Sequence, residues 1–392
     1  MSTRQIDIGL IGSGFMGKGH ALAFTMVPRV FDDLIAIPRL RLLADVDPET
    51  AERAARELGF EGASHDWRNL VAHPDIELVD ITTPNHLHAE MALAAIEAGK
   101  HVYCEKPLAL DAASALRMAE AAEAAGVVTM VGFNYLKSPA ALAAKRMIEA
   151  GVIGDVWHFR GAFNQDVLAD PRQPFGWRFE RGLAGAGALG DLGAHVLALA
   201  LYLVGAVEEV CAHATTVIEE RPEATGGRGY GAGVAAEAPL RRVENEDSMQ
   251  ALLRFSGGAS GVFETSRVAT GRKVHLTYEV TGSRGALVFD HERMNELRLY
   301  ESGDAADRRG FRTVIMGPEH PYYGRFWPVA GCGLGFGDMK VIEVYELLQG
   351  VARQERVRPD FRDGAEVQRV IETLLISAAE RRWVSTKEAA GA

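Results

Sequence analysis

Three glycines near the start of the chain constrain its fold more than any other feature. They follow a short apolar run at residues 6–11 and precede a segment with helical periodicity, in the spacing G-x-G-x-x-G. In such a pattern the first glycine permits a sharp turn, the second lets a pyrophosphate approach the backbone, and the third lets the helix pack closely against the strand. The pattern predicts a dinucleotide-binding turn, with the phosphates at the helix N-terminus. The residues assigned to it are Gly12, Gly14, Phe15, Met16 and Gly17.

Strands and helices are expected to alternate through the N-terminal third of the chain. The alternation indicates βαβ units with right-handed crossovers around a parallel sheet, which predicts an α/β Rossmann domain over residues 1–135. Pro28 and Pro38 bracket the segment 27–38, which we expect to be an irregular insertion. The expected strands are 6–11, 40–45, 77–81, 101–104 and 127–131, with another near Ala63, and the expected helices are 15–26, 86–98 and two that begin after capping aspartates, 48–58 (Asp47) and 112–125 (Asp111).

The pattern changes after Tyr135, and residues 136–392 are expected to form a second domain of α+β class. Strands follow one another there with little helix between them, which indicates an antiparallel meander. The segment 219–239 and the residues from Ser385 onward are expected to be loose. The expected strands are 156–160, 209–217, 247–255, 261–268, 275–281, 286–290 and 296–300, and the expected helices are 139–150, 191–204, 339–350 and 364–382, of which the last two are expected to pack back on the first domain.

The bulk composition excludes several classes of protein. The formal net charge of −11 argues against sequence-independent nucleic-acid binding, which needs a basic face. No run approaches the ~20 apolar residues of a membrane span, and the N-terminus has no signal-peptide pattern. Three distant cysteines suit unpaired thiols in a reducing cytoplasm, and neither they nor the histidines have the spacing of metal ligands. We therefore expect a cytoplasmic enzyme without a metal site.

Asp45 stands at the end of the second expected strand. A carboxylate there would accept hydrogen bonds from both adenosine ribose hydroxyls and repel a 2′-phosphate, which favours NAD over NADP. It lies 28 positions after Gly17, against a typical ~20, and the 27–38 insertion accounts for the excess. The alternative interpretation is a plain polar residue at a strand end.

Two further polar segments follow strands and should lie at the same carboxyl edge of the sheet. In the first, Thr83, Pro84, Asn85 and His88 are candidates to contact the cofactor, near its nicotinamide half, although Asn85 also suits a helix N-cap. In the second, Glu105 precedes Lys106. A lysine there would point its ammonium at the nicotinamide end of the cleft, but taken alone it would more often be a solvated surface charge.

Asp191 and His195 are the other candidate pair. They are four positions apart, so on a helix they would share a face one turn apart. Histidine is the side chain best suited to accept a hydroxyl proton near neutral pH, as alcohol oxidation requires. The alternative is an N-capping aspartate with a half-buried histidine.

These motifs together resemble the glucose–fructose oxidoreductase / inositol dehydrogenase / MocA family. The resemblance runs through nearly the whole chain and rests on the glycine turn, Thr83-Pro84-Asn85-x-x-His88, Glu105-Lys106-Pro107 and Asp191-x-Gly193-x-His195. It implies an N-terminal Rossmann domain and a second domain with a large, open, mostly antiparallel sheet that binds substrate and makes homodimers or homotetramers. It also implies that Lys106 bonds the reacting hydroxyl, that His195 is the general base, that Asp191 orients substrate or His195, and that a cis peptide precedes Pro107.

Within the family, the details resemble levoglucosan dehydrogenase-type members. The similar stretches are 14–20, 132–135, 176–179 and 326–331. The resemblance implies NAD-dependent oxidation of a secondary ring hydroxyl, with levoglucosan, an inositol or a glucoside as substrate; the remote alternative is a dinucleotide-binding regulator without catalysis. Polar residues would bind ring hydroxyls, and tryptophan would cover an apolar sugar face, although most of these aromatics also suit a core. The candidate substrate residues are Lys106, Tyr135, Gln165, Asp166, Trp177, Arg178, Asp191, His195 and Trp327.

Overall fold

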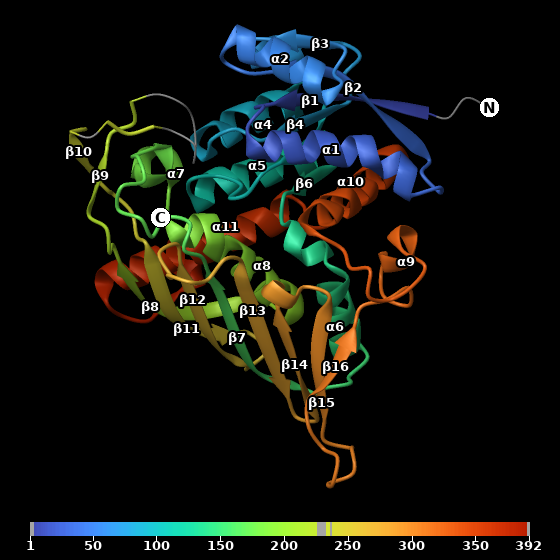
Figure 1. Cartoon of the computed structure of the whole chain (residues 1–392), viewed down its shortest axis with the longest axis vertical. Coiled ribbons are helices and arrows are strands. Elements are labelled where there is room, and N and C mark those ends of the chain that lie inside the picture. Colours follow the sequence, from blue (N-terminus) through green and yellow to red (C-terminus); the bar gives the residue numbers. More distant parts are fainter. Residues whose placement is uncertain (1–3, 226–232, 236, 390–392) are drawn as a thin grey trace.

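Two sheets of different topology organise residues 4–225, 233–235 and 237–389, which the computed structural model describes. One sheet has six strands and the other nine, and a single apolar core cluster runs between them (Figure 1). This arrangement confirms the predicted fold class, a Rossmann domain followed by an α+β part with a large sheet.

The six-stranded sheet is parallel, with the order β3-β2-β1-β4-β5-β6. The strands β1, β2 and β3 follow one another in one direction across the sheet, and β4, β5 and β6 in the opposite direction. Such sheets bind ligands at the point of this reversal, in the crevice at the carboxyl ends of β1 and β4. Its strands are β1 Arg4–Ile11, β2 Ala36–Ala44, β3 Gly62–Ser64, β4 Leu78–Ile81, β5 His101–Cys104 and β6 Thr129–Val131. The intervening helices are α1 Phe15–Val30, α2 Pro48–Leu58, α3 Trp67–Val71, the 3₁₀ turn η1 Asn85–Leu87, α4 His88–Glu97 and α5 Ala112–Ala125.

Both predicted aspartate caps are confirmed. The Asp47 carboxylate accepts a hydrogen bond from the backbone N–H of Thr50 at 2.9 Å, with Pro48 at the first helical position of α2. The Asp111 carboxylate accepts one from Ser114 at 2.7 Å. Each bond satisfies a backbone donor that has no partner within its helix.

The expected irregular insertion at 27–38 is wrong. Helix α1 continues through Pro28 to Val30, and β2 begins at Ala36 and includes Pro38. Pro28 lies in the last turn of α1, where the missing proline N–H removes one hydrogen bond and the helix ends two residues later. Pro38 pairs with β1 on one side, whereas β3 pairs with β2 only from Leu42 onward, so the proline lies where the other edge of β2 is unpaired.

The nine-stranded sheet has the order β16-β15-β14-β13-β7-β12-β11-β8-β17 and is antiparallel except between β7 and β12. Buried and exposed residues alternate along β11, as expected for a sheet with one covered face. Its strands are β7 Val156–Asn164, β8 Val207–Thr215, β11 Ser248–Phe255, β12 Ser260–Ser266, β13 His275–Gly282, β14 Gly285–Asp290, β15 Glu296–Glu301, β16 Arg312–Ile315 and β17 Val384–Ser385.

Two segments expected to be loose contain regular structure. Residues after Ser385 form the short helix α12 Thr386–Ala389, and β17 beside it pairs with β8. Within 219–239, β9 Glu220–Pro222 pairs with β10 Leu240–Arg242, whereas residues 226–232 and 236 lie outside the described part. Four short strands were not predicted from the sequence, because runs of two to four residues show no clear periodicity; they are β9, β10, β16 and β17.

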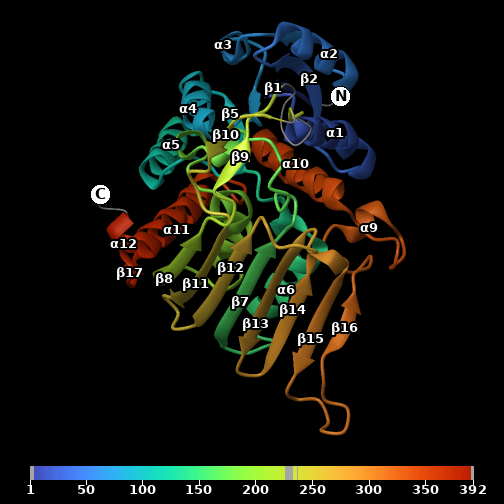
Figure 2. The same cartoon turned by 60° about the vertical axis from the view of Figure 1, so that its left-hand side comes forward.

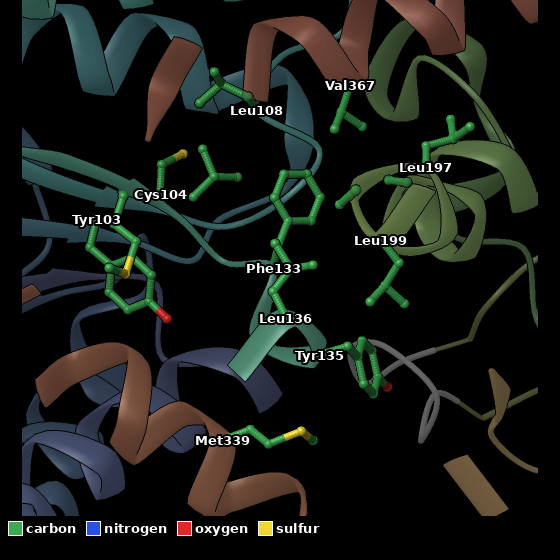
Figure 3. Packing of buried hydrophobic residues seen from close by; sticks show 14 of the residues in the cluster. Tyr103, Cys104, Leu108, Phe133, Tyr135, Leu136, Leu197, Leu199, Met339 and Val367 are labelled. Atoms are coloured by element: carbon green, nitrogen blue, oxygen red, sulfur yellow. The ribbon is translucent and has the colours of Figure 1, made fainter. Parts of the chain in front are cut away.

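Helices cover one face of the nine-stranded sheet and leave the other face open (Figures 1 and 2). The last two long helices, α10 and α11, also pack on the Rossmann part: α10 against α1 and β2, and α11 against α5 and β6. Figure 3 shows apolar side chains from both parts meeting between them. The remaining helical elements are the 3₁₀ turns η2 Asn134–Lys137, η3 Trp177–Phe179 and η6 His291–Arg293, the π-helical turn η4 Leu189–Gly193, and α6 Pro139–Glu149, α7 Arg181–Ala184, α8 Ala194–Leu203, α9 Tyr323–Phe326, α10 Phe336–Arg353 and α11 Phe361–Glu380.

One helical segment, Arg181–Leu203, is long and apolar enough to cross a membrane by length and composition alone. Of its most apolar window, 83% is buried inside the protein. Its apolar side chains therefore belong to the core of the second part, where they hold η4 and α8 in place.

Candidate active site

The glycine turn between β1 and α1 has the geometry of a phosphate-binding loop. Gly12 has φ +97°, a left-handed conformation that favours glycine. A Cβ on Gly17 would lie 2.0 Å from the Gly12 carbonyl oxygen, so the helix could not approach the strand with any larger residue there. A Cβ on Gly14, in contrast, would meet no heavy atom within 4 Å. The turn is therefore closely packed behind and open in front, which fits a pyrophosphate against Gly14.

Helix α1 presents its N-terminus to the same space. Among the described residues, no side chain caps this helix, and its first turn contains no acidic residue. Its backbone N–H groups and partial positive charge remain available for an anion. Phe15 is 78% exposed, with its ring centroid 6.4 Å from that of Phe336, while Met16 is half-buried.

Asp45 lies beside this turn, directly after β2. Its carboxylate accepts hydrogen bonds from the Ser13 hydroxyl at 2.6 Å and from the Ser13 backbone N–H at 3.0 Å. The structure thus brings together the carboxylate and the glycine turn that the sequence placed 28 residues apart.

His88 and Asn85 have structural contacts that differ from the expected ones. Both ring nitrogens of His88 face backbone carbonyls, of Thr83 at 2.9 Å and Pro107 at 2.8 Å, and the side chain is buried. His88 therefore joins the Thr83-Pro84 segment to the loop after Lys106 and has no ring nitrogen left for a cofactor. The Asn85 amide donates to the Ala184 carbonyl at 3.0 Å and does not cap a helix. The N-cap alternative for Asn85 is therefore wrong, whereas its contact with the cofactor stays a prediction; a contact from His88 would have to come from atoms other than its ring nitrogens.

Lys106 and Asp191 form an ion pair between the two halves of the chain. The Lys106 ammonium donates to the Asp191 carbonyl at 2.6 Å and to its carboxylate at 3.0 Å, and the Lys106–Pro107 peptide is cis, as expected. The Arg178 guanidinium lies 3.8 Å from the other carboxylate oxygen. Burial alone would raise the pKa of Asp191, but the charges of Lys106 and Arg178 outweigh it and hold that pKa below the usual range. Lys106 is thus not the solvated surface charge of the alternative interpretation.

A π-helical turn lies between Asp191 and the helix that carries His195. Asp191 lies within η4, and His195 lies in the first turn of α8. Within the described residues no hydrogen bond joins the two side chains, because the Asp191 carboxylate binds Lys106 and Arg178 instead. The shared face expected from their spacing stays a prediction.

His195 lies in an aromatic enclosure. Its ring is 4.7 Å from that of Tyr135 and 6.0 Å from those of Phe133 and Phe163, and only 6% of the residue is exposed. Its Nδ1 is buried without a hydrogen-bond partner. Burial, with the charge of Lys106 second, lowers the pKa of His195 well below the ordinary 6.5. The imidazole is therefore neutral near neutral pH and able to accept a proton.

The candidate sugar-binding residues divide into two groups. Tyr135 contacts His195, and Arg178, which lies over the Trp177 ring at 4.4 Å, approaches Asp191. For the other candidates the described contacts lead elsewhere, and their part in sugar binding stays a prediction. The Asp166 carboxylate binds Lys273 and the Gly271 N–H, Gln165 pairs through its backbone with Ser266 and Ala269, and Trp327 follows α9, whose Arg325 pairs with Asp32 and Asp33 beyond the far end of α1.

Two polar residues near the candidate site were not predicted from the sequence. His291 lies in η6, after β14, with its ring 4.8 Å from that of Tyr135 and perpendicular to it, and burial lowers its pKa to about 4. Glu246 accepts hydrogen bonds from the backbone N–H groups of Gly187 and Leu189 and so holds the loop that leads into η4. Neither belongs to a recognisable motif, because both reach the site from strands distant in sequence.

Comparisons with known proteins agree with this geometry. Residues 6–133 match the oxidoreductase family with an NAD-binding Rossmann fold, and residues 141–288 match the GFO/IDH/MocA C-terminal domain. Levoglucosan dehydrogenase of Pseudarthrobacter phenanthrenivorans is 44% identical over 386 residues, which is 98% of this chain and 99% of that protein. Myo-inositol 2-dehydrogenase of Thermotoga maritima is 30% identical over 303 residues, 77% of this chain and 80% of that protein. A solved structure of levoglucosan dehydrogenase in complex with NADH and levoglucosan has a TM-score of 0.92 at 43% identity, covering 98% of this chain and 100% of that one.

Proposed function

Because this chain belongs to the Gfo/Idh/MocA family of NAD-binding oxidoreductases, we propose that it oxidises a secondary ring hydroxyl of a sugar or cyclic polyol with NAD. Similarity to levoglucosan dehydrogenase makes levoglucosan our first candidate for the substrate, with the 3-keto sugar as its product. The observation that carries the proposal is the Lys106–Asp191 ion pair beside a buried, neutral His195. A structural ion pair alone would not need an unpaired imidazole next to it.

Four side chains of the site would bind the substrate. Lys106 uses two of its three N–H donors on Asp191, which leaves one to donate to the reacting hydroxyl and favour its deprotonation. Arg178 and the remaining acceptor capacity of Asp191 orient neighbouring ring hydroxyls. Tyr135 lines the same space beside His195.

His195 is the proposed general base. Its neutral imidazole accepts the hydroxyl proton while the carbinol carbon loses a hydride, so the alcohol becomes a ketone. Bound NAD supplies the hydride acceptor and leaves as NADH. The low pKa of His195 favours handing the proton on to solvent after each turnover.

The cofactor site uses the N-terminal residues. Gly12, Gly14 and Gly17 with the first turn of α1 would hold the pyrophosphate, and Asp45 would accept the ribose hydroxyls. Thr83 and Pro84 follow β4 and Glu105 follows β5, so their backbone would lie beside the nicotinamide half of a bound cofactor. The carboxylate of Asp45 would repel the 2′-phosphate of NADP.

An absorbance assay tests the proposal directly. We expect the absorbance of reduced nicotinamide at 340 nm to rise when the protein is mixed with NAD and levoglucosan. The rate should be lower with inositols and glucosides, and lower when NADP replaces NAD. Firm NAD binding with no turnover across the whole panel would instead identify a dinucleotide-dependent regulator. Faster oxidation of an inositol than of levoglucosan would instead indicate an inositol dehydrogenase.

The open face of the nine-stranded sheet suits assembly into a homodimer or homotetramer. It carries a hollow of about 650 Å³ and exposes Leu252 and Val262, on adjacent strands, at 49% and 39%. These alternate with charged pairs such as Arg160–Glu279, a mixture that suits contact with a second copy. We expect Val262→Glu to lower the solution mass measured by light scattering; an unchanged mass would place the interface elsewhere.

A further inference from the structure

A buried carboxylate lies immediately behind Lys106. Glu105 is 5% exposed, and its Oε2 accepts a hydrogen bond from the Lys106 backbone N–H at 3.1 Å. Its Oε1 is 3.0 Å from the His20 ring and accepts a hydrogen bond from the Lys340 ammonium at 2.7 Å. The backbone from which Lys106 enters the site is thus tied to two cationic side chains on other elements, α1 and α10.

His20 lies between two buried carboxylates. Its Nδ1 faces the Asp80 carboxylate at 2.9 Å and its Nε2 faces Glu105, so both nitrogens must donate if both carboxylates are ionised. Burial lowers the pKa of His20, but the charge of Asp80 and hydrogen bonds to Asp80 and Glu105 outweigh it and raise that pKa. Burial also raises the pKa of Asp80. For Glu105, burial acts to raise the pKa, but the nearby cations, Lys340 first among them, outweigh it and hold that pKa well below its usual range.

Lys340 comes from α10, beyond both segments that match the family. It is 1% exposed, and its ammonium also contacts Glu343 at 3.0 Å and the Tyr103 hydroxyl at 3.2 Å. Gly132 makes room for this contact, because a Cβ there would lie 2.6 Å from Glu105 Oε1 and 3.1 Å from the Lys340 ammonium. Together these contacts hold the Glu105 carboxylate at one place.

We propose that Lys340 is a positioning residue for Lys106: by fixing Glu105, it sets where the Lys106 backbone begins and hence where the Lys106 ammonium meets the reacting hydroxyl. The inference rests on the role proposed for Lys106. Without Lys340, Glu105 is left buried beside a single cation, and the carboxylate turns or draws in water, which moves the Lys106 N–H bonded to it. A displacement of about 1 Å at a reacting group is enough to cost on the order of 10²-fold in rate.

The pH dependence separates this role from a general loss of stability. The charges that act on His195 are those of Lys106, Glu105, Lys340 and Asp191. The Tyr135 ring contacts His195, and His291 contacts Tyr135. The positive charge of Lys340 lowers the pKa of His195 and the negative charge of Glu105 raises it. Removing the two charges therefore moves the pKa of the base in opposite directions, whereas simple destabilisation would not reverse sign between two variants.

The test compares Lys340→Met, Glu105→Gln and a matched control, Lys137→Met, in the full-length protein. Lys137 is also a buried lysine that pairs with α10, through Glu346, but it does not contact Glu105. We expect Lys340→Met to lower kcat roughly 10- to 100-fold with NADH affinity unchanged, and to shift the acidic limb of kcat/KM to higher pH. Glu105→Gln should shift that limb to lower pH, and Lys137→Met should leave it in place. Equal kcat in Lys340→Met and wild type, or the same shift in all three variants, would overturn the proposal.

A crystal structure of Lys340→Met provides a readout that needs no substrate. We expect the Glu105 carboxylate to move and the 3.0 Å contact between Lys106 and Asp191 to lengthen. Unchanged positions of Glu105, Lys106 and Asp191 would overturn the inference whatever the activity of the variant. If the wild-type protein oxidises no polyol, the proposed function fails, and the crystal structure still decides whether Lys340 positions Lys106.

Discussion

Replacing His195 with asparagine is expected to lower kcat/KM by about 10²- to 10⁴-fold, because it removes the only neutral base beside the Lys106–Asp191 pair in the described site. The wild-type acidic limb should lie below pH 6.5, since burial and Lys106 lower the pKa of His195 and activity is lost as the imidazole becomes protonated. His195→Asn should lose this limb and keep its affinity for NADH. Steady-state kinetics from pH 5 to 10 and NADH fluorescence titration measure both.

A control for this prediction is His213→Asn. His213 is exposed on β8, with its ring near the Thr215 hydroxyl, and should leave turnover and the pH profile as they are. If His195→Asn retains full turnover on a substrate that the wild type oxidises, another group takes the proton. Tyr135 would then be the next residue to vary, because its ring contacts His195.

Replacing Arg267 with methionine is expected to lower the free energy of unfolding by about 3–5 kcal/mol, the usual result of leaving one partner of a buried ion pair uncompensated. Arg267 and Asp247 are 2% and 0% exposed in their side chains and bond at 2.8 Å. The variant leaves the Asp247 carboxylate with the backbone N–H groups of Val217 and Ile218 as its remaining hydrogen-bond donors. Equilibrium urea unfolding followed by circular dichroism measures the change.

The matched control is Arg254→Met, which removes a surface pair with Glu209 whose side chains are 64% and 35% exposed. Exposed pairs contribute little, so its unfolding curve should stay close to that of the wild type. Equal destabilisation in both variants would mean that burial of the Arg267–Asp247 pair is not the cause.

Arg267→Met should also weaken substrate binding. The Arg267 guanidinium and the Asn245 amide both donate to the Arg178 carbonyl, at 3.3 Å and 2.8 Å, and so place Arg178 beside Asp191. We expect a higher KM for the sugar in variant protein that is still folded, measured well below its unfolding midpoint.

The parts predicted from sequence are those governed by local rules. The glycine spacing, the aspartate caps and the alternation of strands and helices each depend on residues close together in the chain, and the structure confirms them. Family resemblance extended this to Lys106, whose ion pair joins residues 85 positions apart. The π-helical turn that carries Asp191 was not predicted, because residue spacing alone does not distinguish a π-helical turn from an α-helical one.

The parts missed depend on packing between distant segments. Pro28 and Pro38 were taken as breakers, although one lies at a helix end and the other where a strand edge is unpaired. The short helix α9 is held near Asp32 and Asp33 by Arg325, a contact between residues almost 300 positions apart that no local pattern predicts. His20, Glu246 and Lys340 reach the site only through contacts with residues at least 57 positions away, which no local pattern encodes.

The placement of α10 and α11 has a consequence for synthesis on the ribosome. The last strand of the parallel sheet ends at Val131, but the helices that cover α1, β2, α5 and β6 begin only at Phe336 and Phe361. At about 5–20 residues per second, roughly 10–40 s pass between the emergence of that sheet and of α10. During this interval the nascent chain exposes apolar surface and holds Glu105 without Lys340. Nascent N-terminal chains should therefore recruit chaperones until the final helices leave the exit tunnel.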